Sequence, residues 1–172
     1  MLMLSLFRHA KSNSDDASMK DAGRPLSERG RDAAPVMGAY LAKEGLLPDL
    51  VLSSPSVRTR ETCALAFQSF RSPPEILFED VLYLASSRTL MSRIRRVESL
   101  VRHLMMVGHN PGLQELALEL ISTGPKQPLA ELEAKLPTGG LVVLQFDSAS
   151  WTDIGPEEAR LARFVTPRML MR

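Results

Sequence analysis

Cysteine, net charge and long hydrophobic runs are all scarce in this sequence, and each scarcity excludes a class of protein. The 172 residues include one cysteine, Cys63, so the chain cannot hold an internal disulfide framework and suits a reducing compartment. The 21 Lys and Arg residues nearly balance the 20 Asp and Glu residues, and the formal net charge is +1. That balance gives no global attraction to nucleic acid or to an anionic membrane, so any electrostatic role must be local.

Hydrophobic runs long enough to cross a bilayer are also missing from the sequence. The apolar start, MLMLSLF, is too short for a membrane-spanning helix and lacks the basic segment and small-residue cleavage site of a secretory signal. We therefore expect a cytoplasmic protein that binds no membrane. A chain of 172 residues with 44% hydrophobic content can bury one substantial core, so residues 1–172 are expected to form a single domain.

Short apolar runs alternate with longer amphipathic segments, which predicts strands and helices in turn. Strands are predicted at residues 2–7, 49–54, 75–79 and 103–108, and two more at the sequences LVVLQF and ARFV. Helices are predicted at residues 28–43, at 55 to about 70, at 86 or 87 to about 100, and after the turn NPG. This order predicts a three-layer α/β/α sandwich around a mostly parallel sheet with an antiparallel edge.

Polar side chains stand where three of the predicted strands end. Arg8 and His9 follow the first strand, Arg58 lies at the start of the helix after the second, and His109 and Asn110 follow the fourth. Ligands of α/β sheets gather outside the carboxyl ends of the strands. We therefore expect these residues, which are far apart in the sequence, to meet at one edge of the sheet.

Two guanidiniums and two imidazoles suit a tetrahedral phosphoryl group. Arginine forks bind the oxygens of a dianion, and a neutral imidazole can attack phosphorus and hold the group as phosphohistidine. The second imidazole can donate a hydrogen bond to those oxygens, and Asn110 is predicted to bind phosphate beside it. Cationic neighbours are expected to lower the pKa of His9 and favour the free base. This chemistry needs no metal or other cofactor, since the arginines already supply positive charge.

Three segments together resemble the histidine phosphatase superfamily, which includes phosphoglycerate mutase. They are LFRHAKS, LSSPSVRTRET and MVGHNPGL, in that order. The resemblance extends from residue 4 to about residue 146, and the short chain is similar to the SixA-type phosphohistidine phosphatases within the superfamily. It implies a phosphoglycerate mutase-like fold, His9 as the nucleophile that becomes phosphorylated, and Arg8, Arg58 and His109 as the rest of the phosphate pocket.

A phosphomonoesterase also needs an acid that protonates the departing alkoxide. The mutases of the superfamily use a Glu shortly before a Tyr-Gly, and the comparable stretch here is LFEDVLYLAS. Counting back from Tyr83 puts Asp80 in that place, with Glu79 as the alternative. Asp15 stands where the mutases carry a phosphate-binding Asn, and we expect its carboxylate to point away from the site.

The length of the segment between the third and fourth predicted strands distinguishes the candidate substrates. The mutases insert a long helical lid between the third and fourth strands, whereas residues 80–102 leave room for one helix only. A site without a lid excludes water poorly, which favours a phosphorylated side chain on a folded protein over a small sugar phosphate. The expected function is that of a phosphohistidine phosphatase acting on a signalling or phosphorelay protein. The alternatives are a broad phosphomonoesterase for small molecules and an inactive module that only binds phosphorylated partners.

Two further groups of charges have simpler explanations. Asp15, Asp16 and Asp21 match no calcium or zinc spacing and are explained by loop solvation. The basic residues between Arg88 and Arg102 are expected to form a solvated helix face, with a docking surface for an acidic partner protein as the alternative.

Overall fold

The strands of the central sheet nearly all run in one direction. The computed structural model describes residues 1–14 and 16–172, and its seven-stranded sheet has the order β3-β2-β4-β1-β6-β7-β5. The strands are β1 (Leu2–Arg8), β2 (Leu50–Ser53), β3 (Glu75–Phe78), β4 (His103–Gly108), β5 (Ile121–Thr123), β6 (Leu141–Phe146) and β7 (Ala159–Val165). The four strands from β3 to β1 are parallel, β6 is antiparallel to both of its neighbours, and β5 is parallel to β7. The carboxyl ends of β1, β2 and β4 therefore lie side by side.

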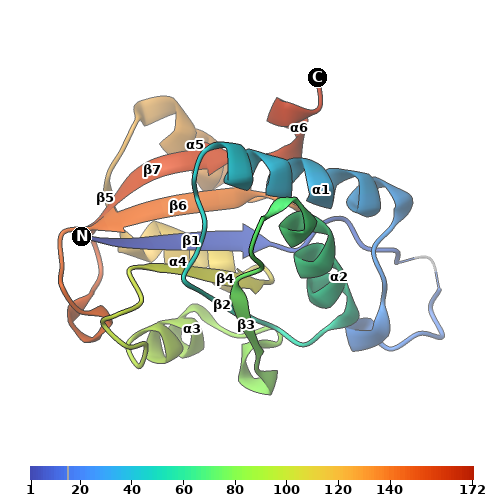
Figure 1. Ribbon diagram of the computed structural model, residues 1–172, viewed down its shortest axis with the longest axis horizontal. Coiled ribbons are helices and arrows are strands. Elements are labelled where there is room, and N and C mark those ends of the chain that lie inside the picture. The colour runs from blue at the N-terminus through green and yellow to red at the C-terminus, as the bar shows by residue number, and fades with distance from the viewer. Residues whose placement is uncertain (15) are drawn as a thin grey trace.

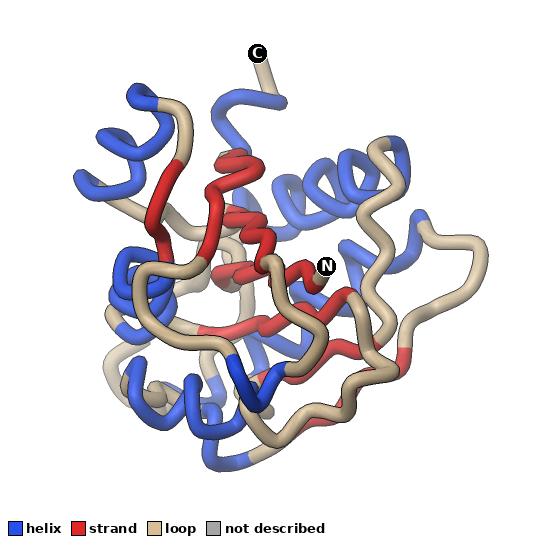
Figure 2. Tube along the Cα trace, turned by 90° about the vertical axis from the view of Figure 1, so that its left-hand side faces the viewer, coloured by secondary structure: helices blue, strands red, loops and turns tan. Residues whose placement is uncertain are grey.

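Helices cover both faces of this sheet (Figures 1 and 2). They are α1 (Glu28–Lys43), α2 (Val57–Ala66), α3 (Ser87–Ile94), α4 (Gly112–Leu120), α5 (Lys126–Ala134) and α6 (Pro167–Leu170). Short 3-10 turns are η1 (Asp21–Gly23), η2 (Phe67–Ser69), η3 (Asp80–Leu82) and η4 (Trp151–Asp153). In Figure 1, α1 and α2 lie in front of the sheet and α4 lies behind it.

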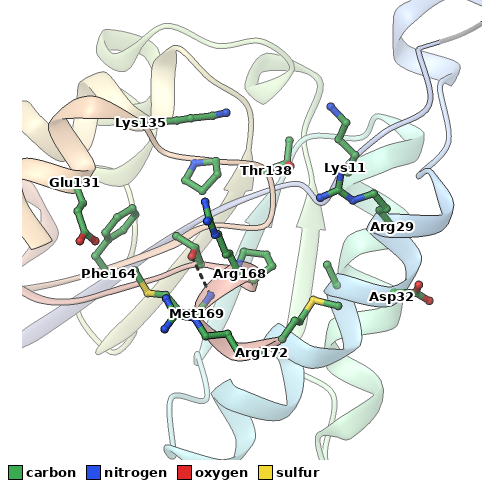
Figure 3. Close-up of a pocket in the computed structure, with 15 residues that line it drawn as sticks. Lys11, Arg29, Asp32, Glu131, Lys135, Thr138, Phe164, Arg168, Met169 and Arg172 are labelled. Carbon is green, nitrogen blue, oxygen red and sulfur yellow. Dashed lines mark hydrogen bonds between the residues drawn. The ribbon is translucent and has the colours of Figure 1, made fainter.

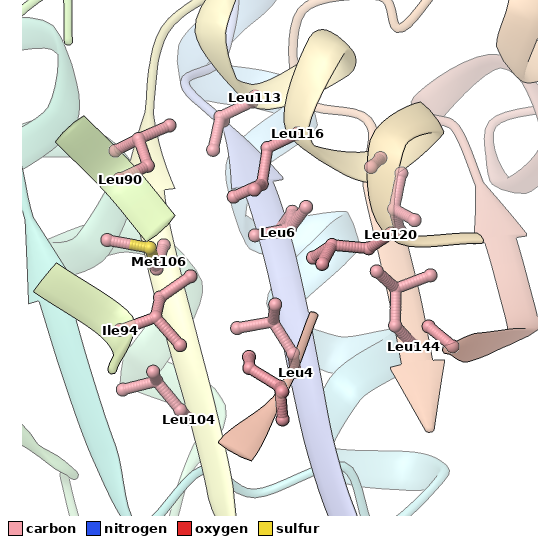
Figure 4. Close-up of a cluster of buried hydrophobic side chains, with 14 of the residues drawn as sticks. Leu4, Leu6, Leu90, Ile94, Leu104, Met106, Leu113, Leu116, Leu120 and Leu144 are labelled. Carbon is pink, nitrogen blue, oxygen red and sulfur yellow. The ribbon is translucent and has the colours of Figure 1, made fainter. Parts of the chain in front are cut away.

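The alternation of side chains along the strands divides the hydrophobic core in two. Leu4 and Leu6 of β1 face the cluster that also holds the buried leucines of α4, and Figure 4 shows those leucines over the strand. Phe7 faces the opposite cluster, where Met37 of α1 and Cys63 of α2 are buried. Successive residues of a strand point to opposite faces, so one apolar run such as β1 supplies both cores. The predicted three-layer sandwich is confirmed.

The packing of α1 on α2 fixes the helix that carries Arg58. Ser27 caps α1 by accepting a hydrogen bond from Gly30 N, and Ser56 caps α2 by accepting one from Thr59 N. A Cβ atom placed on Gly38 would lie 1.8 Å from the backbone oxygen of Ala66. Only glycine permits so close an approach, so α2 packs tightly against α1.

The structure differs from the prediction in five elements. The antiparallel strand β6 lies inside the sheet and not at its edge, because the chain enters β6 beside the carboxyl end of β1 and β7 then pairs with its other side. The strand β5 and the helices α5 and α6 were not predicted, since they are short and lack a clear apolar period. Helix α3 ends at Ile94, before the predicted residue 100, because the chain turns there and Arg95 donates hydrogen bonds to the backbone oxygen of Ile154.

Two further predictions concern the limits of the chain. The segment between β3 and β4 contains only η3 and α3. It stays a prediction that residues 1–172 form a single domain without a lid. Among the described residues, no helix combines the length and the apolar character that crossing a membrane requires.

Candidate active site

The backbone brings the two imidazoles to the same edge of the sheet. In the β1–β4 pair Arg8 stands opposite Gly108, and His9 N donates a hydrogen bond of 3.1 Å to the Gly108 oxygen. This register leaves His9 and His109 next to each other just beyond the strand ends, with their ring centroids 5.3 Å apart. The predicted convergence of these two histidines is present in the structure.

Hydrogen bonds fix the tautomer and direction of the His9 ring. His9 Nδ1 lies 2.7 Å from the backbone oxygen of Ala10. Because a carbonyl oxygen can only accept, Nδ1 carries the proton and Nε2 keeps a free lone pair. The His9 backbone is held as well, since Gly139 N donates to its oxygen at 2.8 Å. Residue His9 is only 6% exposed, so its Nε2 is held in a nearly buried position suited to a nucleophile.

His109 is held between a hydroxyl and a guanidinium. Its Nε2 lies 2.8 Å from Ser54 Oγ, and its Nδ1 lies 3.2 Å from Arg58 Nη2. A guanidinium only donates, so Nδ1 accepts from Arg58 and the proton of His109 sits on Nε2, facing Ser54. His109 therefore needs a second proton, or a shift of its proton to Nδ1, before it can donate to a phosphate oxygen from the side where Arg58 lies.

An acidic residue completes this cluster, and the sequence did not identify it. Arg58 donates from Nη1 to the backbone oxygen of Asp21 at 2.8 Å and from Nη2 to its carboxylate at 2.9 Å. The Tyr83 hydroxyl donates to the same carboxylate oxygen, and the Tyr83 ring stands edge-on to His109 with centroids 5.4 Å apart. The expectation that Asp21 only solvates its loop is wrong. Asp15 lies outside the described residues.

Burial and charge together keep both imidazoles neutral. Burial, assisted by the charges of Arg58 and Arg8 and opposed by the hydrogen bond to Ala10, lowers the pKa of His9 from 6.5 to about 4. Burial also lowers the pKa of His109 to about 3, assisted by His9 and Arg58 and opposed by the Asp21 carboxylate. The hydrogen bond from Tyr83 and the Arg58 charge hold the pKa of Asp21 below its usual value. The site thus presents two free-base imidazoles beside two cations and one anion.

These shifts predict that His9 and His109 stay neutral well below the ordinary pKa of histidine. Each ring is a full free base above about pH 5 and gains its proton only as pH falls through about 4 for His9 and about 3 for His109. NMR titration of the imidazole signals measures these pKa values. The chain has three histidines, so single substitutions assign every signal. Inorganic phosphate is expected to raise both values, because an anion stabilises imidazolium. Protonation of either ring near 6.5 in the free protein would contradict this electrostatic description.

Arg8 and Asn110 are both anchored to the loop that precedes β6. Arg8 Nη1 and Asn110 Nδ2 donate to the backbone oxygen of Leu136 at 3.0 and 2.9 Å. Arg8 Nε is buried without a hydrogen-bond partner among the described residues, so this cation keeps a spare donor beside His9. The Asn110 amide serves the loop, and its predicted contact with phosphate stays a prediction.

The two candidate acids differ in their surroundings. Glu79 accepts two hydrogen bonds from Arg93, at 2.7 and 3.0 Å, and these lower its pKa. Asp80 is exposed at the start of η3, one turn before Tyr83. Among the interactions of the described residues, neither carboxylate contacts His9 or His109. A paired carboxylate with a lowered pKa is a poor proton donor, so the structure favours Asp80 over Glu79.

Two other predictions concern groups outside this cluster. Cys63 is buried in α2, which raises its pKa to about 12, so it is a packed thiol and no nucleophile. The described residues hold no group of three or more His, Cys, Asp or Glu side chains arranged to bind a metal. That the reaction needs no metal or cofactor stays a prediction.

Comparison with known proteins agrees with this geometry. The family model of the histidine phosphatase superfamily (branch 1) matches residues 4–79. An uncharacterized protein of Mycobacterium tuberculosis is 36% identical over 94% of this chain and 99% of its own. A crystal structure from Agrobacterium tumefaciens, described as a candidate phosphohistidine phosphatase SixA, is 30% identical, has a TM-score of 0.81, and matches 96% of this chain and 98% of that one.

The chain belongs to the histidine phosphatase superfamily. A second structure, a candidate SixA from Nakamurella multipartitia, has a TM-score of 0.80 at 27% identity, covering 96% of both chains. Membership of the superfamily supports phosphatase activity, and the neutral His9 beside Arg8, Arg58 and His109 is the arrangement that such chemistry requires.

Proposed function

We propose that this chain is a phosphohistidine phosphatase that forms a phosphohistidine on its own His9. The observation that carries the proposal is the free Nε2 of His9, nearly buried, with its ring 5.3 Å from that of His109 and within the field of Arg8 and Arg58. A neutral imidazole held in one tautomer beside two guanidiniums can attack an incoming phosphoryl group without first losing a proton.

The reaction has two displacements. In the first, His9 Nε2 attacks phosphorus and forms an N–P bond, while the N–P bond of the substrate breaks and the departing imidazole takes up a proton from solvent. In the second, water attacks the phosphorus on His9 and the N–P bond to His9 breaks. Inorganic phosphate leaves, the proton lost by the water passes to solvent, and His9 returns to its free-base form. Arg8 and Arg58 balance the charge on the phosphoryl oxygens in both steps.

The site residues have distinct roles in these steps. Arg58 exchanges its hydrogen bond to His109 Nδ1 for one to the phosphoryl group, and His109, once protonated on Nδ1, donates to an oxygen as well. Asp21 keeps the Arg58 fork oriented by holding its Nη1 and Nη2 atoms. Its negative charge also opposes a free phosphate dianion, which favours release of the product.

Two observations support phosphohistidine on a protein as the substrate. The connection between β3 and β4 contains only η3 and α3, which leaves the site reachable by a side chain on another protein. The imidazole of phosphohistidine leaves without strong acid assistance. Of the two candidate acids, Glu79 is paired with Arg93, and Asp80 has no contact with the imidazoles among the described residues. We propose a phosphorylated signalling or phosphorelay protein as the partner and the cytoplasm as the location.

The need for a general acid distinguishes phosphohistidine from the alternative substrate, a small phosphoester. Asp80→Asn is expected to reduce turnover of an aryl phosphate by about 10²-fold or more, the usual contribution of a general acid, and to leave phosphohistidine turnover nearly unchanged. Glu79→Gln is the matched control, because it also replaces a carboxylate with an amide, one residue earlier. The measurement is kcat/KM for an aryl phosphate and for a phosphohistidine peptide in all three proteins.

The outcomes of that comparison distinguish the functions. Wild-type preference for the peptide, with selective loss of ester turnover in Asp80→Asn, supports the proposal. A wild-type protein that cleaves esters efficiently and ignores the peptide would instead assign the small-molecule function. Binding without turnover of either substrate would assign the inactive phosphate-binding module.

A further inference from the structure

A cavity of about 950 Å³ is lined by residues that neighbour His9 and its supporting loop in the sequence. It is lined by Lys11 and by Pro137 and Thr138 of the loop before β6, together with parts of α1, α5 and α6 (Figure 3). The same loop holds the active-site residues, because Leu136 O accepts from Arg8 and Gly139 N donates to His9 O. Lys11 follows His9 by two residues, a stretch that spans at most about 7 Å.

Unpaired positive charge gathers around this cavity. Its lining contains two acidic residues, Asp32 and Glu131, and five basic ones, so we call it the basic cavity. The five basic residues are Lys11, Arg29, Lys135, Arg168 and Arg172. Arg168 and Arg172 belong to the C-terminal segment, and the other three come from three separate parts of the chain. Figure 3 shows Arg168 in the middle of the group and the carboxylate of Asp32 turned outward. None of the five side chains forms a hydrogen bond or ion pair with another of the described residues.

Arginines elsewhere on the surface are mostly held by the protein itself. Arg93 pairs with Glu79, Arg163 pairs with Glu44, and Arg95 donates to a backbone oxygen. Within the basic stretch from Arg88 to Arg102, hydrogen bonds hold Arg93, Arg95 and Arg102. The whole chain has a net charge of only +1, so five unpaired cations around one hollow make a local concentration of positive charge. These cations repel one another unless an anion binds among them.

Resting on the proposed function, we propose that the basic cavity binds an acidic segment of the phosphoprotein substrate while its phosphohistidine occupies the His9 pocket. At about 950 Å³ the cavity is much larger than one phosphoryl group needs. Phe164, Met169 and Met171 lie among its cations, which suits a peptide that carries apolar as well as acidic side chains. Two acidic residues on the lining disfavour the continuous phosphate backbone of a nucleic acid.

Direct binding tests the site without any catalysis. The probe is a fluorescein-labelled peptide rich in Glu and Leu, compared with the same peptide carrying Gln at each Glu. The double variant Lys135→Gln/Arg168→Gln is expected to bind the Glu peptide about tenfold more weakly than the wild type. The matched control is Lys43→Gln/Arg71→Gln, which removes one Lys and one Arg from exposed positions outside the cavity and is expected to bind like the wild type.

Turnover tests the link to the active site. Two phosphohistidine peptides, one with Glu and one with Gln beside the phosphorylated residue, are compared by kcat/KM. The wild type is expected to prefer the acidic peptide by about tenfold, the double variant to lose that preference, and all proteins to cleave phosphoramidate equally.

Failure of this inference is distinct from failure of the proposed function. If no phosphohistidine substrate is cleaved but the Glu peptide still binds in the basic cavity, the function is wrong and the anion site stands. If both peptides are cleaved equally by every protein, or if the double variant binds the Glu peptide as the wild type does, the docking proposal is overturned. Tighter binding of a DNA duplex than of the Glu peptide, lost in the double variant, would also overturn it.

Discussion

Replacing His9 with alanine is expected to abolish turnover of every phosphorylated substrate that the wild-type protein cleaves. The substitution removes the atom that we propose forms the covalent intermediate, His9 Nε2, whose partner nitrogen Nδ1 donates to the Ala10 oxygen. Loss of a nucleophile costs at least about 10⁴-fold in kcat, because the remaining groups can only stabilise direct attack by water. Steady-state kinetics on an aryl phosphate and on a phosphohistidine peptide measure the loss.

The third histidine supplies the control for this experiment. His103 lies at the start of β4, at the opposite end of the strand from His109, and its Nε2 contacts Ser5 Oγ at 2.7 Å. His103→Gln is expected to keep nearly full activity, since its ring takes no part in the site. Equal loss in both variants would mean that the substitutions damage the fold, and full activity of His9→Ala would remove His9 from the mechanism.

Replacing Arg58 with alanine is expected to cost about 10³-fold in kcat/KM, the second largest effect. Its guanidinium organises the site from both sides, because it donates to Asp21 and to His109 Nδ1. Without it the phosphoryl oxygens lose a charged fork, and the Asp21 carboxylate is left without its cation. Arg58→Lys is expected to recover only part of the activity, because an ammonium cannot reproduce the two-atom contact.

Arg60 offers a matched control on the same helix. Its guanidinium donates to the Pro55 oxygen and stacks over the ring of Phe78, 4.1 Å from the centroid, so it serves packing and not the phosphate pocket. Arg60→Ala is expected to lower stability slightly and leave kcat/KM close to that of the wild type. Kinetics and thermal denaturation of the two variants separate the roles, and equal kinetic losses would contradict the assignment of Arg58.

The parts of the fold predicted from the sequence are those that the hydrophobic period determines locally. The apolar run of β1 is buried on both faces, and the Ser27 cap marks the start of α1, so both elements were predicted closely. The strand β5 has three residues, two of them exposed, and gives no such signal. The interior position of β6 depends on which strand pairs with its free side, and no local pattern records that choice.

The site shows the same division between local and long-range information. His9 and His109 were predictable because each follows a buried strand, and parallel neighbours end at one edge. Asp21 begins the short 3-10 turn η1 and reaches the site through contacts with Arg58 and Tyr83, which are distant in the sequence, so its place could not be read from spacing. In the sequence, Tyr83 only helped to locate the candidate acid Asp80, and its own contact with His109 was not predicted.

Trapping the phosphorylated enzyme tests the central claim most directly. The wild-type protein is mixed with phosphoramidate or acetyl phosphate, quenched within milliseconds in alkali, where phosphohistidine is stable, and mapped by mass spectrometry, with His9→Ala and His103→Gln in parallel. We expect an alkali-stable, acid-labile phosphoryl group on His9 in the wild type and in His103→Gln, and none in His9→Ala. Turnover of substrate with a phosphoryl group on another residue, or with none on His9 at any quench time, would contradict the account.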